Sequence, residues 1–144
     1  MKSYCPDLNV WLALAYRGHQ HHPAAAAWFD RLGAEQAAFC RFTQLGLLRL
    51  LTHPAVMRDE VKTQQEAWRA YDRLSSDPRV AFYSEIDPER IEDALRALTA
   101  SSRFAHQQWP DAYLAAFAKA SGLTLVTFDK ALGRLGGRDC LVLG

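Results

Sequence analysis

The sequence has few cysteines and no cysteine pair. Cys5, Cys40 and Cys140 lie far apart along the chain and form no CxxC motif. An odd number at such spacings disfavours a disulfide framework and a zinc site built on paired thiolates. Each cysteine lies in or beside a stretch that we expect to be a buried strand, where a free cysteine packs as a small apolar residue. The pattern predicts a reducing, cytoplasmic compartment.

Long apolar runs and a charge imbalance are also missing. No run of apolar residues approaches the roughly 20 that a membrane-spanning helix needs, and the first six residues lack the basic start and apolar core of a signal peptide. Lys and Arg number 17 against 16 Asp and Glu, a formal net charge of +1. No field over the whole molecule therefore attracts nucleic acid or a membrane. Any RNA-binding surface must be a local patch.

Short apolar segments alternate with amphipathic segments along the chain. This alternation is typical of an α/β fold with a mainly parallel sheet. We find no internal repeat, low-complexity tract or linker, so we expect one domain over residues 1–144. The predicted strands cover residues 2–6, 37–42, 80–84, 123–128 and 140–143.

Prolines and a threonine mark the expected helix starts. Pro23, Pro88 and Pro110 can each take the first position of a helix, and Thr43 is expected to cap a helix that Pro54 ends. Gly122 is the expected cap at the end of the helix that starts at Pro110. Right-handed crossovers then cover both sheet faces, which predicts a three-layer α/β/α sandwich around roughly five strands.

Three aspartates fall where this fold class binds ligands. Asp7 directly follows the first predicted strand, Asp129 follows strand 123–128, and Asp111 opens the helix before that strand. Ligands of open parallel sheets bind at the carboxyl ends of the strands. Clustered carboxylates repel one another unless a cation compensates, and a set of oxygen ligands suits Mg²⁺ or Mn²⁺. Such a cation activates water for phosphodiester hydrolysis.

Each aspartate also has a purely structural explanation. Asp7 and Asp129 can cap the helices that follow them, and Asp111 can complement a helix dipole. An enzyme class and a regulatory domain class also use acids near the first strand. A phosphatase of the haloacid-dehalogenase type needs a second acid where this chain has Asn9, and a receiver-like domain needs paired acids near the first strand. Both requirements are unmet, whereas the joint placement of the three aspartates favours a metal site.

Four segments resemble PIN-domain ribonucleases. Residues 6–14 (PDLNVWLAL) are similar to the opening D-x-N-V stretch of that family. Residues 39–54 (FCRFTQLGLLRLLTHP) are similar to one branch of VapC-type toxins from bacterial toxin–antitoxin pairs. Residues 111–116 (DAYLAA) and 127–130 (TFDK) complete the likeness in the same order. The resemblance extends from about Asp7 to Asp129.

The resemblance implies a PIN-like sandwich that cleaves RNA endonucleolytically with Mg²⁺ or Mn²⁺ and an activated water. Asp7, Asp111 and Asp129 match the acidic metal-site residues of the family. Asn9 and Thr127 match the polar residues that support them, although Asn9 can instead cap the following helix. The expected partners are an RNA substrate, a cognate antitoxin whose basic side chain enters the acidic pocket, and a second copy bound through the apolar helix 45–51.

One position departs from the family pattern. PIN domains commonly carry a glutamate near the start of the helix after the second strand, where this chain has Gln44. We include Gln44 in the catalytic group and expect Gln44→Glu to tighten Mn²⁺ binding. Arg49 and Lys130 are candidates for binding RNA phosphates. The alternative to a nuclease is a non-catalytic PIN-like module whose acidic pocket recruits a basic partner segment, and metal-dependent turnover separates the two.

Overall fold

A five-stranded parallel sheet forms the centre of the computed structural model, which describes residues 2–144. The strand order is β3-β2-β1-β4-β5, and every neighbouring pair is parallel. The predicted α/β class and strand number are confirmed. Met1, where the predicted domain begins, lies outside the described residues. The strands are β1 (Ser3–Pro6), β2 (Gln36–Phe39), β3 (Val80–Phe82), β4 (Thr124–Thr127) and β5 (Cys140–Val142).

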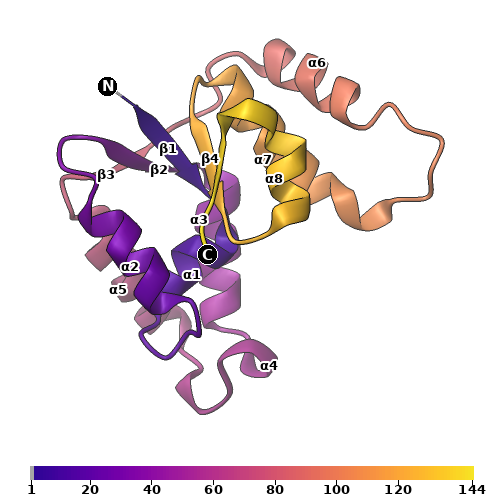
Figure 1. The fold of residues 1–144 in the computed structure, drawn as a ribbon. Coiled ribbons are helices and arrows are strands. Elements are labelled where there is room, and N and C mark those ends of the chain that lie inside the picture. The colour runs from indigo at the N-terminus through magenta and orange to yellow at the C-terminus, as the bar shows by residue number, and fades with distance from the viewer. Residues whose placement is uncertain (1) are drawn as a thin grey trace.

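Helices cover both faces of the sheet, so the predicted three-layer sandwich is confirmed (Figure 1). Within residues 2–144, no helix combines the length and apolar character required to span a bilayer. One face carries α1 (Leu8–Ala15), α2 (His22–Asp30), α3 (Arg41–Leu51) and α5 (Gln64–Ser75), with the short α4 (Pro54–Met57) and η1 (Arg58–Glu60) after α3. The other face carries α6 (Pro88–Leu98), η2 (His106–Gln108), α7 (Trp109–Ala120), α8 (Lys130–Gly136) and η3 (Gly137–Asp139).

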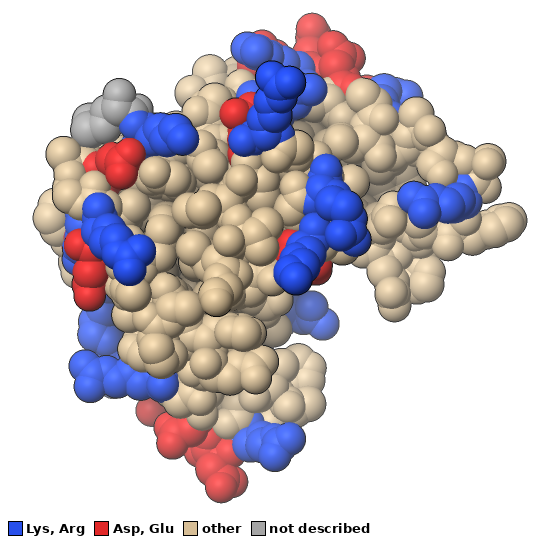
Figure 2. Space-filling model, viewed as in Figure 1, with Lys and Arg blue, Asp and Glu red and all other residues tan. Residues whose placement is uncertain are grey.

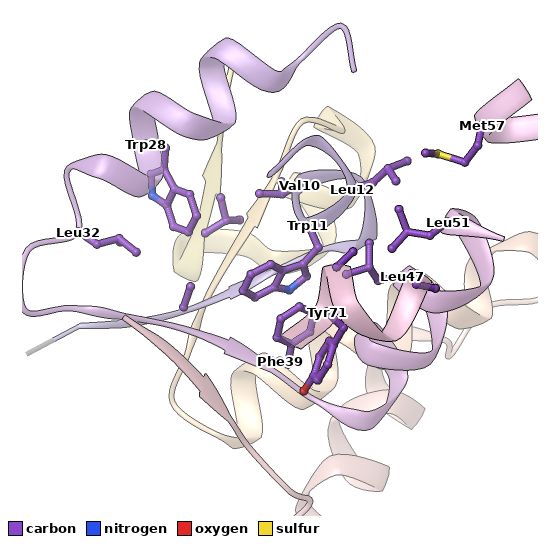
Figure 3. Close-up of a cluster of buried hydrophobic side chains, with 14 residues drawn as sticks. Val10, Trp11, Leu12, Trp28, Leu32, Phe39, Leu47, Leu51, Met57 and Tyr71 are labelled. Carbon is purple, nitrogen blue, oxygen red and sulfur yellow. The ribbon is translucent and has the colours of Figure 1, made fainter. Parts of the chain in front are cut away.

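Stacked aromatic side chains hold the first helix layer on the sheet (Figure 3). The ring of Trp11 in α1 stacks on Phe39 at the end of β2, with centroids 3.7 Å apart. Tyr71 of α5 contacts the same Phe39 ring edge-on at 4.9 Å. All three side chains are buried. This packing fixes α1, and with it the turn between β1 and α1, against the middle of the sheet.

The position of β1 gathers distant segments at one edge. β1 lies between β2 and β4, and the backbone N–H of Asp7 donates to the carbonyl of Val126 at 2.9 Å. Because all strands are parallel, the residues that follow β1, β2, β3 and β4 meet at the same sheet edge. Helix α7 leads directly into β4, so its first turn also lies at this carboxyl edge.

The boundary between β2 and α3 differs from the prediction. The strand ends at Phe39 rather than residue 42, because α3 already begins at Arg41. Cys40 is the N-cap, so the prediction that Thr43 caps this helix is wrong. Thr43 lies one turn inside, where its hydroxyl accepts the Cys40 N–H at 3.0 Å and closes a capping box. The two phenylalanines and the cysteine among residues 39–42 are typical of a strand, which explains why the predicted strand extends too far.

Two other helix features can be compared directly with the prediction. Gly122 follows α7 with a φ of +69°, which confirms it as the residue that ends the helix. The expected exposed apolar face of residues 45–51 is much smaller than predicted. Leu45 is 56% exposed, whereas Leu47 and Leu51 are fully buried against the core.

Candidate active site

Asp7 and Thr127 form a buried pair at the carboxyl ends of β1 and β4. Asp7 is the N-cap of α1, and its Oδ1 accepts the backbone N–H of Val10 at 3.0 Å. Its Oδ2 accepts the hydroxyl of Thr127 at 2.5 Å. The same Thr127 oxygen accepts the backbone N–H of Asp129 at 2.9 Å. Thr127 therefore links the two acidic residues that follow neighbouring strands, as its expected supporting position requires.

Asp129 combines a capping position with a free oxygen at the same edge. It is the N-cap of α8, and its Oδ1 accepts the N–H groups of Ala131 at 2.8 Å and Leu132 at 3.4 Å. Within residues 2–144, its second carboxylate oxygen accepts no hydrogen bond. The helix-capping role expected from the sequence is thus confirmed for both Asp129 and Asp7. The second carboxylate oxygen of Asp129 stays available to a ligand.

Asp111 is the least constrained of the three aspartates. It lies half-buried in the first turn of α7, and its carboxylate has no hydrogen-bond partner in the described part of the chain. Burial, and then the negative charge of Asp129, raise its pKa. Burial also raises the pKa of Asp7, hydrogen bonds from Thr127 and Val10 oppose the increase, and the charge of Asp111 adds to it. Asp111 therefore experiences charge repulsion with both Asp7 and Asp129.

The donor set fits a hard divalent cation. All candidate ligands are carboxylate oxygens, and both Asp111 and Asp129 have oxygens without hydrogen bonds. A cation would relieve the repulsion that raises the pKa of Asp111. As the side chains stand, no three Asp, Glu, His or Cys residues among residues 2–144 are arranged to hold a metal ion. Asp111 has the most freedom to adjust, because no hydrogen bond holds its carboxylate.

The side chain of Gln44 is hydrogen-bonded to Arg41. It is buried in α3, and its Oε1 accepts a hydrogen bond from the guanidinium of Arg41 at 2.5 Å. Burial raises the pKa of Tyr71, while a hydrogen bond from Gln44 and the charge of Arg41 lower it. In the described part of the chain, Gln44 makes no side-chain hydrogen bond to an aspartate. The amide oxygen of Gln44 is therefore occupied by Arg41.

The remaining predicted site residues, Asn9, Lys130 and Arg49, are all exposed. Asn9 is exposed on α1 and does not cap it, because Asp7 does. Lys130 is exposed directly after Asp129, beside the acids. Arg49 is exposed in α3, about 12 Å further along the helix axis than Arg41. Basic and acidic side chains are mixed over the face in Figure 2, without a broad field of one sign.

A pocket of about 170 Å³ beside this edge contains residues that the sequence did not single out for the site. The hydroxyl of Tyr113 donates to the carboxylate of Glu85 in it. Only position offered a clue in the sequence, because Glu85 follows β3 and Tyr113 lies two residues after Asp111. The lining residues are Cys40, Arg41, Phe82, Tyr83, Ser84, Glu85, Tyr113 and Phe117.

Comparison with known proteins finds relatives that align with nearly the full length of this chain. Ribonuclease VapC41 of Mycobacterium tuberculosis is 42% identical over 141 residues, which cover 95% of this chain and 96% of that protein. Ribonuclease VapC29 of the same organism is 34% identical over 139 residues, covering 95% of this chain and 92% of that protein. Both relatives thus match this chain from one end of the sandwich to the other.

Solved structures share the fold at low sequence identity. VapBC2 from Rickettsia felis, crystallised with a DNA fragment from its promoter, superposes with a TM-score of 0.73 at 14% identity over 99% of both chains. The toxin VapC20 of Mycobacterium tuberculosis, which cleaves the sarcin-ricin loop, gives 0.65 at 17% identity over 92% of this chain and 95% of that one. The PIN domain family model matches residues 4–138. With that match and a relative that is 42% identical over 95% of this chain, this chain belongs to the PIN-domain family.

Proposed function

We propose that this chain is a divalent-metal-dependent endoribonuclease that acts as the toxin of a toxin–antitoxin pair. The observation that carries the proposal is the meeting of Asp7, Asp111 and Asp129 from three separate segments at one sheet edge, where burial and neighbouring negative charge raise the pKa of Asp7 and of Asp111. The names of the relatives, Ribonuclease VapC41 and Ribonuclease VapC29, support the same activity.

The three aspartates would hold Mg²⁺ or Mn²⁺. When bound, such a cation would polarise the phosphodiester and activate a water molecule. Asp7 contributes a carboxylate whose direction is set by the Val10 N–H and the Thr127 hydroxyl. Asp129 keeps one oxygen on the N-terminus of α8 and offers the other. Asp111, with no hydrogen bond to hold it, completes the set. Lys130 lies beside this group and can contact an RNA phosphate.

A cognate antitoxin is the proposed protein partner. An arginine side chain entering the three-carboxylate edge would form charge-assisted hydrogen bonds and compete with the metal. The solved complex of VapBC2 from Rickettsia felis supports a partner of this kind. A homodimer also remains part of the proposal, although in the 45–51 segment only Leu45 offers a strongly exposed apolar side chain.

The test is cleavage of total bacterial RNA by the purified chain with Mg²⁺ or Mn²⁺, with and without EDTA. Asp111→Asn and Asp129→Ser should each abolish metal-dependent fragments. Serine keeps an N-cap oxygen for α8, so loss of activity in Asp129→Ser reports on the carboxylate rather than on the helix. Asp87→Ser is the matched control, because Asp87 caps α6 in the same way, with Oδ1 accepting the Arg90 N–H at 3.1 Å.

Two results would overturn the proposal. One is a folded wild-type protein that cuts no RNA with either metal, which would favour the binding module with an acidic pocket. The other is equal activity of Asp129→Ser, Asp111→Asn and Asp87→Ser, which would restrict Asp111 and Asp129 to structural roles.

A further inference from the structure

Arg41 is an exposed arginine whose side chain is held in place. It is the first residue of α3, directly after the end of β2. Its guanidinium donates to the buried Gln44 and lies over the ring of Phe82, 4.9 Å from the centroid. A free arginine side chain samples many rotamers. Part of that freedom is already lost in the folded chain, so less remains to be lost when an anion binds.

The positive charge of Arg41 has no carboxylate partner. The two ion pairs within residues 2–144 are Arg79–Asp77 and Arg96–Glu92. Glu85 lines the same pocket as Arg41, but its carboxylate accepts the Tyr113 hydroxyl and forms no ion pair with the guanidinium. Gln44 uses one of the guanidinium N–H groups, and the others are available. A planar array of such donors matches a phosphate group.

The position of Arg41 at the carboxyl edge of the sheet suggests which anion it binds. β2 pairs directly with β1, and neighbouring strands lie about 4.8 Å apart. Arg41 follows β2 and Asp7 follows the neighbouring β1, so both lie at the same edge, and the guanidinium of Arg41 reaches over Phe82 at the end of β3. Neighbouring phosphates of a single RNA strand are separated by a distance of the same order. A strand whose scissile phosphate lies at the aspartates would bring a flanking phosphate toward Arg41.

We propose that Arg41 binds an RNA phosphate next to the scissile one, and that Gln44 is the residue that positions it. The inference rests on the proposed nuclease function and adds a binding subsite to it. Gln44 thereby acts through Arg41 and not on the metal. Its buried amide keeps the guanidinium at the sheet edge without neutralising it, because an amide oxygen accepts a hydrogen bond but carries no charge.

The test measures RNA binding apart from cleavage. A fluorescent single-stranded RNA is titrated with protein in EDTA, at several salt concentrations, and anisotropy gives the dissociation constant. Arg41→Ala should weaken binding about tenfold and reduce the slope of log K against log salt by about 0.7, the value for one phosphate contact in single strands. Arg41→Lys should restore part of the affinity, since it keeps the charge but not the planar donors.

Gln44→Glu tests the positioning role without removing a cation. The new carboxylate pairs with Arg41, so RNA binding should weaken while the fold, checked by circular dichroism and thermal melting, is retained. Arg73→Ala is the matched control. Arg73 is an exposed arginine near the end of α5, which leads into β3 and so lies at the opposite sheet edge. Its substitution should leave both the affinity and the salt slope unchanged.

Equal RNA affinity for Arg41→Ala and Arg73→Ala overturns the inference, as does Gln44→Glu with wild-type affinity. The binding assay needs no turnover, so its failure differs from failure of the nuclease proposal. A wild-type protein that cuts nothing but loses RNA affinity on Arg41→Ala would overturn the nuclease and leave the subsite standing.

Discussion

The hydroxyl of Thr127 donates to the carboxylate of Asp7 across 120 positions of sequence. The contact joins the ends of β1 and β4, and the same oxygen accepts the Asp129 N–H. Thr127 thus orients the carboxylate of Asp7 and holds the backbone of Asp129. Its burial protects both hydrogen bonds from water.

Thr127→Val removes this hydroxyl while keeping the shape of the side chain. We expect metal-dependent RNA cleavage to fall by about 10-fold to 100-fold, because groups that orient metal ligands typically contribute that much. The free energy of unfolding in urea should fall by about 1–3 kcal/mol, since two buried partners lose a hydrogen bond. Thr127→Ser, which keeps the hydroxyl, should retain most activity. Full activity in Thr127→Val would contradict a supporting role.

The raised pKa values of Asp7 and Asp111 predict how the stability of the metal-free protein depends on pH. A carboxyl whose pKa is higher in the folded state than in the unfolded state destabilises the fold once it is ionised. Stability should therefore decrease as pH rises from the ordinary aspartate pKa through the raised values, and stay low above them. Mildly acidic buffer should raise the melting temperature in EDTA.

Asp111→Asn removes one of these charges and its repulsion with Asp129. In EDTA at neutral pH, the variant should melt at a higher temperature than the wild type, and the difference should shrink in acid. Added Mn²⁺ should reverse the order, because only the wild type keeps all three carboxylates. Asp93→Asn, on the exposed face of α6, should follow the wild type throughout. A variant that melts lower at every pH in EDTA would exclude repulsion as the cause.

The hydrogen bond between Arg41 and Gln44 changes what we expect of the Gln44→Glu variant. The family pattern predicts that Gln44→Glu tightens Mn²⁺ binding, whereas the contact with Arg41 predicts that the new carboxylate is neutralised there. We expect calorimetry to give the same Mn²⁺ affinity for wild type and variant. A clear gain in affinity would return position 44 to the metal site.

Gly122 supplies a test of the backbone that ends α7. Its φ is +69°, and a side chain would meet no atom within 4 Å, so the cost of substitution comes from the backbone conformation alone. Gly122→Ala should reduce the free energy of unfolding by about 1 kcal/mol, and Gly122→Asn by less, because asparagine tolerates this conformation. Urea unfolding checks both, and an alanine variant as stable as the wild type would contradict the reasoning.

Local sequence patterns predicted the strands and the places of the three aspartates beside strands and helices. These features depend mainly on residues close together in the sequence. The run of residues 123–128 is rich in apolar and β-branched residues, so it identifies the buried strand β4 without knowledge of its partners. Asp7 and Asp129 follow strands directly, and parallel pairing then brings them to one edge. The prediction of one domain over residues 1–144 stays a prediction.

Features that depend on side-chain contacts between distant elements were not predictable in the same way. The side chain of Gln44 turns toward Tyr71, which comes from a helix that no motif connects to it. The Tyr113–Glu85 hydrogen bond joins residues 28 positions apart, on α7 and after β3. The exposure of Asn9 depends on Asp7 taking the N-cap, and both residues are acceptable caps by type.

The central place of β1 has a consequence for how the protein is made. β1 is synthesised first, but the strand that completes its hydrogen bonding on one side, β4, comes near the end of the chain. A nascent chain that stops before residue 127 contains Asp7 but lacks Asp129 and the Thr127 contact. The proposed metal site therefore cannot assemble until residue 129 has left the ribosome, however early β1 is made.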